Sequence, residues 1–136
     1  MACGYYVTTV LRDVGFKVER RKLAQQPSEQ IVRTLSPEDS IMRFRKGDSK
    51  LVVSEIEERG EGLYVVGLDN HVGFLLHDGN KVEFCHASYV DPAEVRCEDP
   101  LKSKAFASNY HVVGELFTRP MIEAWLEGKA IKTKTP

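Results

Sequence analysis

This sequence of 136 residues has few cysteines, almost no net charge and no long apolar run. Its three cysteines are scattered and include no C-x-x-C pair, so the chain has neither a disulfide framework nor the usual pattern of a zinc site. The net charge of −1 gives no general attraction to nucleic acid or to an anionic membrane. No window holds the roughly 18 apolar residues that a membrane-spanning helix requires. These absences exclude several classes of protein and leave a globular domain.

The remaining composition is ordinary for such a domain. Apolar residues make up 42% of the chain and charged residues 29%, and the length of 136 residues suits a single domain, residues 1–136, with a real core. Met1-Ala2 leads directly to Cys3, which is not the pattern of a signal peptide. The residues predict no cofactor and indicate neither a compartment nor an oligomeric state.

The three cysteines are expected to differ in role because their surroundings differ. Cys85 lies in the middle of a predicted strand, between Phe84 and His86. Both Cys85 and Cys97 are expected to be small buried hydrophobes, with a pairing of the two as the alternative. Cys3 directly precedes a helical pattern. Backbone N–H groups without partners and the positive end of the helix dipole favour a thiolate there, so Cys3 is the candidate nucleophile.

Hydrophobic spacing predicts an N-terminal helix over residues 4–14. Its apolar residues recur at i, i+3, i+4 and i+7, and they are Val7, Val10, Leu11 and Val14. Further helices are expected at residues 27–35, 36–46 and 120–127, the last with Met121, Ile122, Trp125 and Leu126 on one face. Residues 16–26 are expected to be irregular, and residues 129–136 to form a frayed tail.

Clusters of β-branched and aromatic residues predict the strands of a small sheet. Strands are expected at residues 51–57, 63–68, 71–77, 80–88 and 110–117, with a short edge segment at 93–96. Those between residues 63 and 88 follow one another through tight connections and form a meander. Residues 54–59 also fit a helix, and residues 98–103 are polar and expected to be exposed.

Asp78-Gly79 between two apolar runs is a strong signal for a β-hairpin. If these two residues form the loop, counting outward along both strands places His71 opposite His86, with Cβ atoms roughly 5 Å apart on one sheet face. If the loop is Gly79-Asn80 instead, Ser88 can take the place of His86 opposite His71. The hairpin therefore predicts two polar side chains that face one another.

The other two histidines, His77 and His111, are expected to be structural or exposed. His71, His77 and His86 together could form a metal site, but no acidic ligand accompanies them at a suitable spacing. No metal is predicted.

Three short motifs, taken together, resemble those of the NlpC-type cell-wall peptidases, a branch of the papain-like cysteine hydrolases. They are Cys3-Gly4-Tyr5-Tyr6-Val7, His71-Val72-Gly73-Phe74 and His86-Ala87-Ser88. The resemblance covers residues 3–15 and 63–89. Residues 16–62 have no counterpart in it, and the substrate-binding groove is expected there.

The resemblance implies an α+β, papain-like fold in which a small antiparallel sheet packs against an N-terminal helix that carries the nucleophile. It implies Cys3 as nucleophile, His71 as general base and later acid, and His86 as the third residue that orients His71. Backbone N–H groups at the start of the Cys3 helix would contribute to an oxyanion hole.

The function implied is hydrolysis of an amide bond, in a peptide or a peptidoglycan stem peptide, through a thioester acyl-enzyme. Two alternatives stay open. One is a catalytically inactive binding domain on the same fold, and the other is an acyl-transfer enzyme that uses the same three residues.

Overall fold

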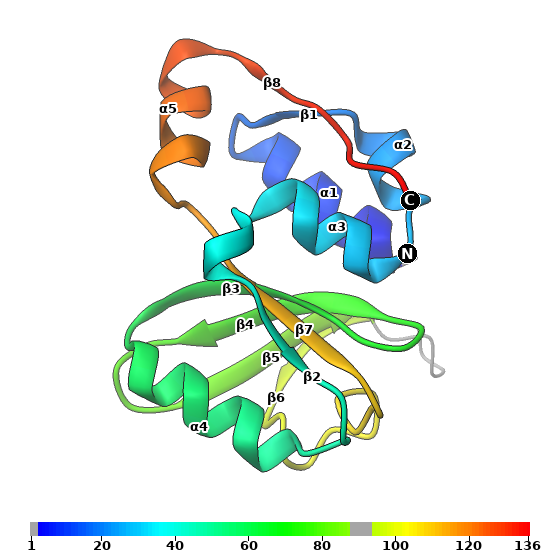
Figure 1. Ribbon diagram of the computed structural model, residues 1–136, viewed down its shortest axis with the longest axis vertical. Coiled ribbons are helices and arrows are strands. Elements are labelled where there is room, and N and C mark those ends of the chain that lie inside the picture. Colours follow the sequence, from blue (N-terminus) through cyan, green and yellow to red (C-terminus); the bar gives the residue numbers. More distant parts are fainter. Residues whose placement is uncertain (1–2, 88–93) are drawn as a thin grey trace.

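The computed structural model describes residues 3–87 and 94–136 and shows an α+β fold built on a six-stranded antiparallel sheet (Figure 1). The strand order is β2-β7-β3-β4-β5-β6, and two short strands, β1 and β8, pair separately. The elements are α1 (Cys3–Asp13), β1 (Lys17–Val18), α2 (Arg20–Ala24), α3 (Ser28–Leu35), the 3-10 helix η1 (Glu38–Ser40), β2 (Met42–Phe44), α4 (Ser49–Arg59), β3 (Gly62–Gly67), β4 (Val72–His77), β5 (Val82–Ala87), β6 (Val95–Glu98), β7 (His111–Glu115), α5 (Arg119–Glu127) and β8 (Ala130–Ile131).

Helices cover both faces of the sheet, with α1, α2 and α3 on one side and α4 on the other (Figure 1). Side chains of a strand alternate between the two faces, and the burial follows this rule in β4. Phe74 packs into the cluster that contains Val7 and Leu11 of α1, while Leu75 packs into the cluster that contains Val52 of α4. Each strand of the predicted meander is thus buried on both faces.

The tip of the hairpin is Gly79-Asn80, so the register built on an Asp78-Gly79 loop is wrong by two residues. His77 pairs with Val82, and Asp78 N–H donates to the Lys81 carbonyl at 3.3 Å. Only Gly79 has a positive φ, +98°, whereas the type I′ turn of the prediction needs one at both central residues. The Asp78 carboxylate also accepts from Asn80 and Lys81 N–H, both at 2.9 Å, and thereby holds the turn.

Two predicted elements between residues 36 and 59 have the wrong type. The predicted helix at 36–46 is a single 3-10 turn followed by β2, because Ser36 Oγ donates to the Glu115 carbonyl at 2.8 Å instead of capping a helix. The predicted strand at 51–57 lies in α4, so the helix left open as the alternative for residues 54–59 is the observed structure. The Asp48 side chain accepts from Leu51 N–H at 3.1 Å as the N-cap. Strand pairing thus determined the structure of residues 36–46, and an N-cap contributed to the helix that contains residues 51–57.

The segment before residue 27 and the C-terminal tail are both more ordered than expected. Residues 17–18 pair in parallel with residues 130–131, and Thr133 N–H donates to the Glu19 carboxylate at 2.8 Å. Residues 20–24 form the short helix α2. The tail is therefore tied to the N-terminal part of the chain by backbone pairing.

The helices predicted at 4–14, 27–35 and 120–127 are confirmed as α1, α3 and α5, and the return strand at 110–117 is confirmed as β7. The apolar face predicted for α5 is only partly buried: Met121 is buried, whereas Trp125 is 46% and Leu126 70% exposed. No helix among the described residues has the length and apolar character needed to cross a bilayer.

Candidate active site

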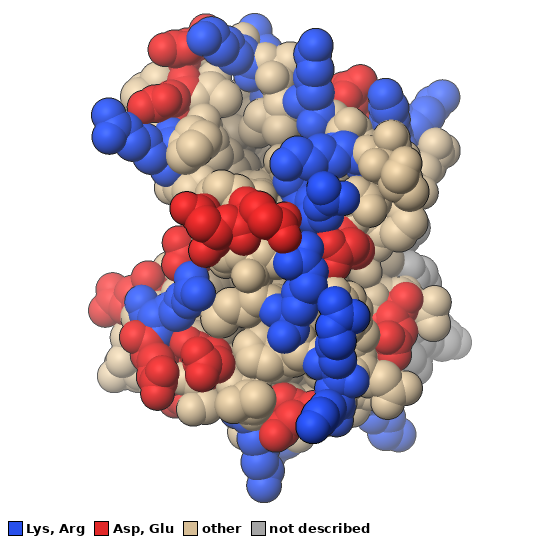
Figure 2. Space-filling view, in the orientation of Figure 1, with Lys and Arg blue, Asp and Glu red and all other residues tan. Residues whose placement is uncertain are grey.

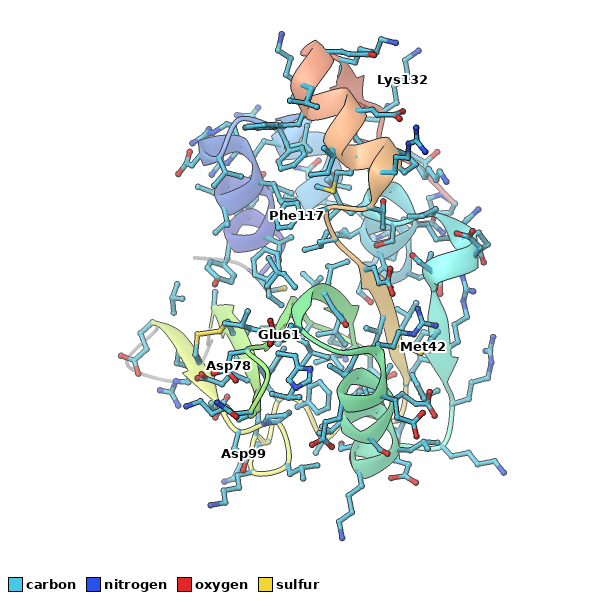
Figure 3. All side chains as sticks on the ribbon, turned by 90° about the vertical axis from the view of Figure 1, so that its left-hand side faces the viewer. Met42, Glu61, Asp78, Asp99, Phe117 and Lys132 are labelled. Atoms are coloured by element: carbon cyan, nitrogen blue, oxygen red, sulfur yellow. A yellow bond between two sulfur atoms is a disulfide. The ribbon has the colours of Figure 1, made fainter. Side chains whose placement is uncertain are left out.

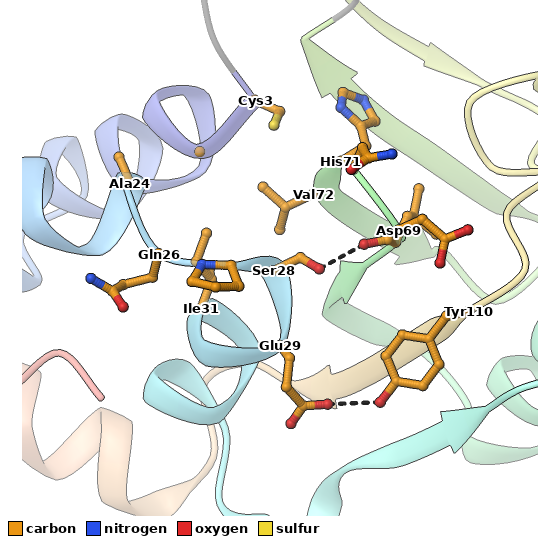
Figure 4. Close-up of a pocket in the computed structure, with 14 residues that line it drawn as sticks. Cys3, Ala24, Gln26, Ser28, Glu29, Ile31, Asp69, His71, Val72 and Tyr110 are labelled. Carbon is orange, nitrogen blue, oxygen red and sulfur yellow. Dashed lines mark hydrogen bonds between the residues drawn. The ribbon is translucent and has the colours of Figure 1, made fainter. Parts of the chain in front are cut away.

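Cys3 and His71 line one pocket of about 540 Å³ between the helical layer and the end of the sheet. Figure 4 shows both on the same side of this pocket, with Glu29 and Tyr110 on the other side. Cys3 is half-buried at the head of α1, and His71 is 8% exposed just before β4. The structure therefore brings together the predicted nucleophile and the predicted base, which are 68 residues apart in sequence (71 − 3).

The head of α1 is positioned by close packing against α2. A Cβ atom at Gly4 would lie 2.5 Å from the Ala24 carbonyl oxygen, so only glycine allows this approach. Further along α1, Val7 and Leu11 are fully buried. The predicted helical face therefore anchors α1, and the glycine after Cys3 lets α2 lie beside Cys3.

The two predicted histidines contact each other directly. His71 Nε2 lies 2.7 Å from His86 Nδ1, and the two rings are perpendicular. Because the hairpin register differs by two residues from the predicted one, the side chains stay on the predicted face, but His86 is diagonal to His71. The residue directly opposite His71 in this register is Ser88, which lies outside the described residues.

Gly73 provides the space in which the two rings meet. A Cβ atom there would lie 2.8 Å from the Cys85 carbonyl oxygen and 3.0 Å from His86 Cβ. The His86 ring also stacks on Phe84, with centroids 4.2 Å apart. The glycine of the His-Val-Gly motif thus has a steric reason: it leaves room for a histidine on the neighbouring strand.

The contacts continue beyond the three predicted residues to Glu98 and Ser103. His86 Nε2 lies 2.5 Å from Glu98 Oε2, and Ser103 Oγ donates to the same oxygen at 3.0 Å. The sequence interpretation missed both residues because residues 98–103 were expected to be exposed; Ser103 is buried. The alternative pairing of Cys85 with Cys97 was the available signal, since it places Glu98 one residue beyond a cross-strand partner of β5.

The carboxylate determines which ring nitrogens carry protons. A carboxylate only accepts hydrogen bonds, so His86 Nε2 carries a proton, and Nδ1 of a neutral His86 ring presents its lone pair to His71. His71 Nε2 then donates to His86, which leaves Nδ1 of His71 as its basic nitrogen. The tautomer of both rings follows from Glu98.

Two pKa shifts agree with this protonation pattern. Burial, and then the neighbouring His86, lower the pKa of His71 from 6.5 to about 4, so the ring is neutral at pH 7. Burial opposes ionisation of Glu98, but hydrogen bonds from His86 and Ser103 outweigh it, and the pKa of Glu98 is lowered. A neutral imidazole backed by an ionised carboxylate can accept a proton.

Cys85 and Cys97 form a disulfide, which corrects the expectation that both are separate buried thiols (Figure 3). They are direct partners in the β5–β6 ladder, with Cα atoms 4.0 Å apart. Cys85 is buried as predicted, whereas Cys97 is exposed. The alternative pairing of Cys97 with Cys85 is therefore the observed state, and Cys3 is not part of a disulfide.

The opposite side of the pocket is polar and internally paired. Tyr110 Oη donates to Glu29 at 2.7 Å, and Arg43 contacts the same carboxylate at 2.8 Å (Figure 4). The hydrogen bond from Arg43 is the main cause that lowers the pKa of Glu29. Residues 24–31 supply six of the lining side chains, so the segment expected to carry the groove does form one wall.

The remaining histidines lie away from the pocket. His77 is buried at the end of β4, and His111 is fully buried with Nε2 2.7 Å from the Phe106 carbonyl oxygen. Among residues 3–87 and 94–136, no three His, Cys, Asp or Glu side chains converge as metal ligands.

Comparisons with protein-family models, with curated proteins and with solved structures found no match for this chain.

Proposed function

We propose that this protein is a cysteine hydrolase of the papain-like type, related in its catalytic arrangement to the NlpC-type peptidases, and that it cleaves an amide bond. One observation carries the proposal: Cys3 at the head of α1 lines the same pocket as His71, whose ring is held by His86. A nucleophile, a base and an orienting group are the three parts that covalent amide hydrolysis needs.

In the first half-reaction, the Cys3 thiol gives its proton to Nδ1 of His71 and the sulfur attacks the carbonyl carbon of the amide. Backbone N–H groups of the first turn of α1, together with the positive end of its dipole, stabilise the oxyanion that forms. His71 then donates the proton to the departing amine, which leaves a thioester on Cys3.

The second half-reaction uses the same groups in reverse. His71 takes a proton from water, the resulting hydroxide attacks the thioester, and Cys3 leaves as a thiol after His71 returns the proton. Each turnover requires a neutral His71 to begin, which its lowered pKa provides. His86 keeps the proton on Nε2 of His71, and so the basic nitrogen stays the same throughout.

The substrate class is a peptide, with a peptidoglycan stem peptide favoured by the resemblance of the three motifs. The pocket volume of about 540 Å³ lies within the usual range for small-ligand sites, about 300–1,000 Å³. Its lining combines apolar side chains such as Ile31 and Val72 with polar ones such as Gln26 and Asp69, as a short peptide segment would require.

The test is replacement of Cys3 by Ala, with Cys3→Ser as the sterically closer variant. Digestion of purified peptidoglycan and of stem peptides, followed by mass spectrometry, is expected to show new amine and carboxyl ends with the wild type and none with Cys3→Ala. Iodoacetamide is expected to alkylate Cys3 faster than a cysteine in an unstructured peptide. Turnover retained in Cys3→Ala would rule out the mechanism.

The same measurements decide between the hydrolase and the two alternatives. An inactive binding domain would bind a peptide in the pocket without turnover. Its Cys3 would be alkylated no faster than the cysteine of the unstructured peptide. Transfer of the acyl group to an added amine in preference to water would identify an acyl-transfer enzyme.

A further inference from the structure

The edge strand β6 carries the carboxylate that sets the protonation of the site. β6 ends at Glu98 and pairs with β5 alone among the described strands. In this ladder Cys97 is opposite Cys85, and Phe84 is opposite Glu98, so Glu98 reaches His86 diagonally. The disulfide therefore joins the two strands one residue away from both His86 and Glu98.

The disulfide and the Glu98–His86 contact lie on opposite faces of the same two strands. Cys85 belongs to the core cluster on the α1 side, whereas Phe84, on which His86 stacks, belongs to the cluster on the α4 side. The disulfide thus fixes the separation and register of β5 and β6 without filling the space in which the carboxylate meets the ring.

The disulfide is open to attack from one side. Cys97 is exposed, while Cys85 is 8% exposed. Thiol–disulfide exchange requires access to one sulfur, and Cys97 provides it. A small reductant can therefore reach the bond without unfolding the sheet.

We propose that the Cys85–Cys97 disulfide is a redox control of the catalytic site that acts through Glu98. This inference rests on the proposed function. A dithiol reductant attacks Cys97 as its thiolate, forms a mixed disulfide and releases Cys85. The second thiol of the reductant then releases Cys97. The cysteine pair gains two electrons and two protons, and the reductant becomes a disulfide.

Reduction weakens the hold on Glu98 because the disulfide no longer cross-links β6 to β5 at the residue next to Glu98. The bond from Ser103 remains, but the carboxylate is no longer kept within reach of His86 by the strand itself. His86 then takes either tautomer. In the form that carries a proton on Nδ1 it cannot accept from His71, and His71 loses its fixed basic nitrogen. Cys3 becomes less reactive as a result.

The experiment measures alkylation of Cys3 by iodoacetamide in the whole protein, resolved by mass spectrometry of the Cys3 peptide. Oxidised protein is compared with protein reduced by a phosphine, and the double variant Cys85→Ser with Cys97→Ser provides the reduced geometry without a reductant. We expect reduction to lower the alkylation rate of Cys3 about tenfold. This is the smaller end of the effects seen when a group that orients a functional histidine is lost. Circular dichroism confirms that each form is folded.

Glu98→Gln tests whether the disulfide acts through the carboxylate. In this variant the rate is expected to be low in both redox states, so that reduction changes it by less than about twofold. Glu83→Gln is the matched control, since its side chain is 29% exposed like that of Glu98 and contacts Lys81 rather than His86. Glu83→Gln is expected to keep the full response to reduction.

Nitrogen-15 NMR of the histidine rings gives a readout that a merely structural role would not move. Oxidised wild type is expected to show His86 with its proton on Nε2, and both the reduced protein and Glu98→Gln a mixture of tautomers. An equal loss on reduction in Glu98→Gln, or unchanged Cys3 reactivity in reduced wild type, would overturn the inference. If Cys3 is unreactive in every form, the proposed function fails first.

Discussion

At the scale of single residues, the site depends on which ring nitrogens carry protons and on whether two rings can meet. Glu98 decides the first, because its carboxylate can only accept. Gly73 decides the second, because any side chain there would meet the backbone of Cys85 and the side chain of His86. The contact between His71 and His86 therefore depends on Gly73 as much as on the two histidines themselves.

Replacing Gly73 by Ala tests this steric requirement. The added Cβ would lie 2.8 Å from Phe84 Cε1 as well as 2.8 Å from the Cys85 carbonyl oxygen, so β5 must shift. We expect a loss of about 1–3 kcal/mol in the free energy of unfolding, typical of overpacking, and a lower rate of Cys3 alkylation. Urea unfolding and the iodoacetamide rate check the two effects.

Gly60→Ala is the control for this variant. Nothing lies within 4 Å of a Cβ at Gly60, but its φ is +97°, so alanine is strained there without touching the site. It is expected to lower stability and leave Cys3 reactivity unchanged. A Gly73→Ala protein that alkylates at the wild-type rate would show that His86 is not held by this packing.

At the scale of elements, the helices on the two sides of the sheet have different positions relative to the pocket. The helices α1 and α3 carry the walls of the pocket, whereas α4 covers the opposite face and contributes no lining residue. α4 exists because Asp48 caps it and because Val52, Val53 and Ile56 are buried against the sheet. The same cluster contains Phe84, on which the His86 ring stacks, so α4 supports both the fold and the packing behind His86.

Asp48→Ala tests whether the stability of α4 can be lowered without a change in the reactivity of Cys3. Loss of the cap bond to Leu51 N–H is expected to cost about 1 kcal/mol, as for other N-cap residues. Thermal unfolding should report the lower stability, while the rate of Cys3 alkylation in the folded protein stays at the wild-type value. A change in that rate would mean that the packing of α4 helps to hold His86 in place.

At the scale of the whole molecule, charge is balanced overall but distributed unevenly. Figure 2 shows Lys and Arg side chains in a line that begins over the helical layer and continues over β2. Arg43 of β2 is neutralised by Glu29 and Glu38, both at 2.8 Å. The pH dependence of folding should therefore owe more to buried histidine than to this surface.

His71 links global stability to pH. Its pKa is about 4 in the folded protein and 6.5 when unperturbed, so between these values the unfolded chain binds a proton that the folded protein does not. The stability is fully present above pH 6.5 and falls as the pH decreases toward 4. The loss is on the order of 3 kcal/mol when one pKa unit is taken as about 1.4 kcal/mol.

His71→Asn isolates this contribution. Free energies of unfolding in urea are compared at several pH values between 7 and 4, and the wild type is expected to lose stability relative to the variant over this range. NMR titration of the His71 ring gives the folded pKa directly. A constant difference between the two proteins across the range would show that His71 titrates normally in the folded state.

Local patterns were sufficient for much of the fold. The i, i+3, i+4 spacing in residues 4–14 predicted α1, and Gly128 in the left-handed conformation ends α5 as expected. Turn chemistry was less reliable, since Asp78 holds the hairpin with its side chain and moves the tip to Gly79-Asn80. The two-residue shift preserved the sheet face, and so the two histidines still meet.

The sequence by itself determined the N-terminal helix and the meander, because helical and strand periodicity are local properties. The grouping of Cys3, His71 and His86 was a prediction from the resemblance of three short motifs. The tertiary structure alone decided that residues 51–57 are helical, that β6 brings Glu98 to His86, and that Cys85 bonds Cys97. These depend on which strands become neighbours. Neighbours are chosen by the burial of whole faces, which no short window of sequence contains.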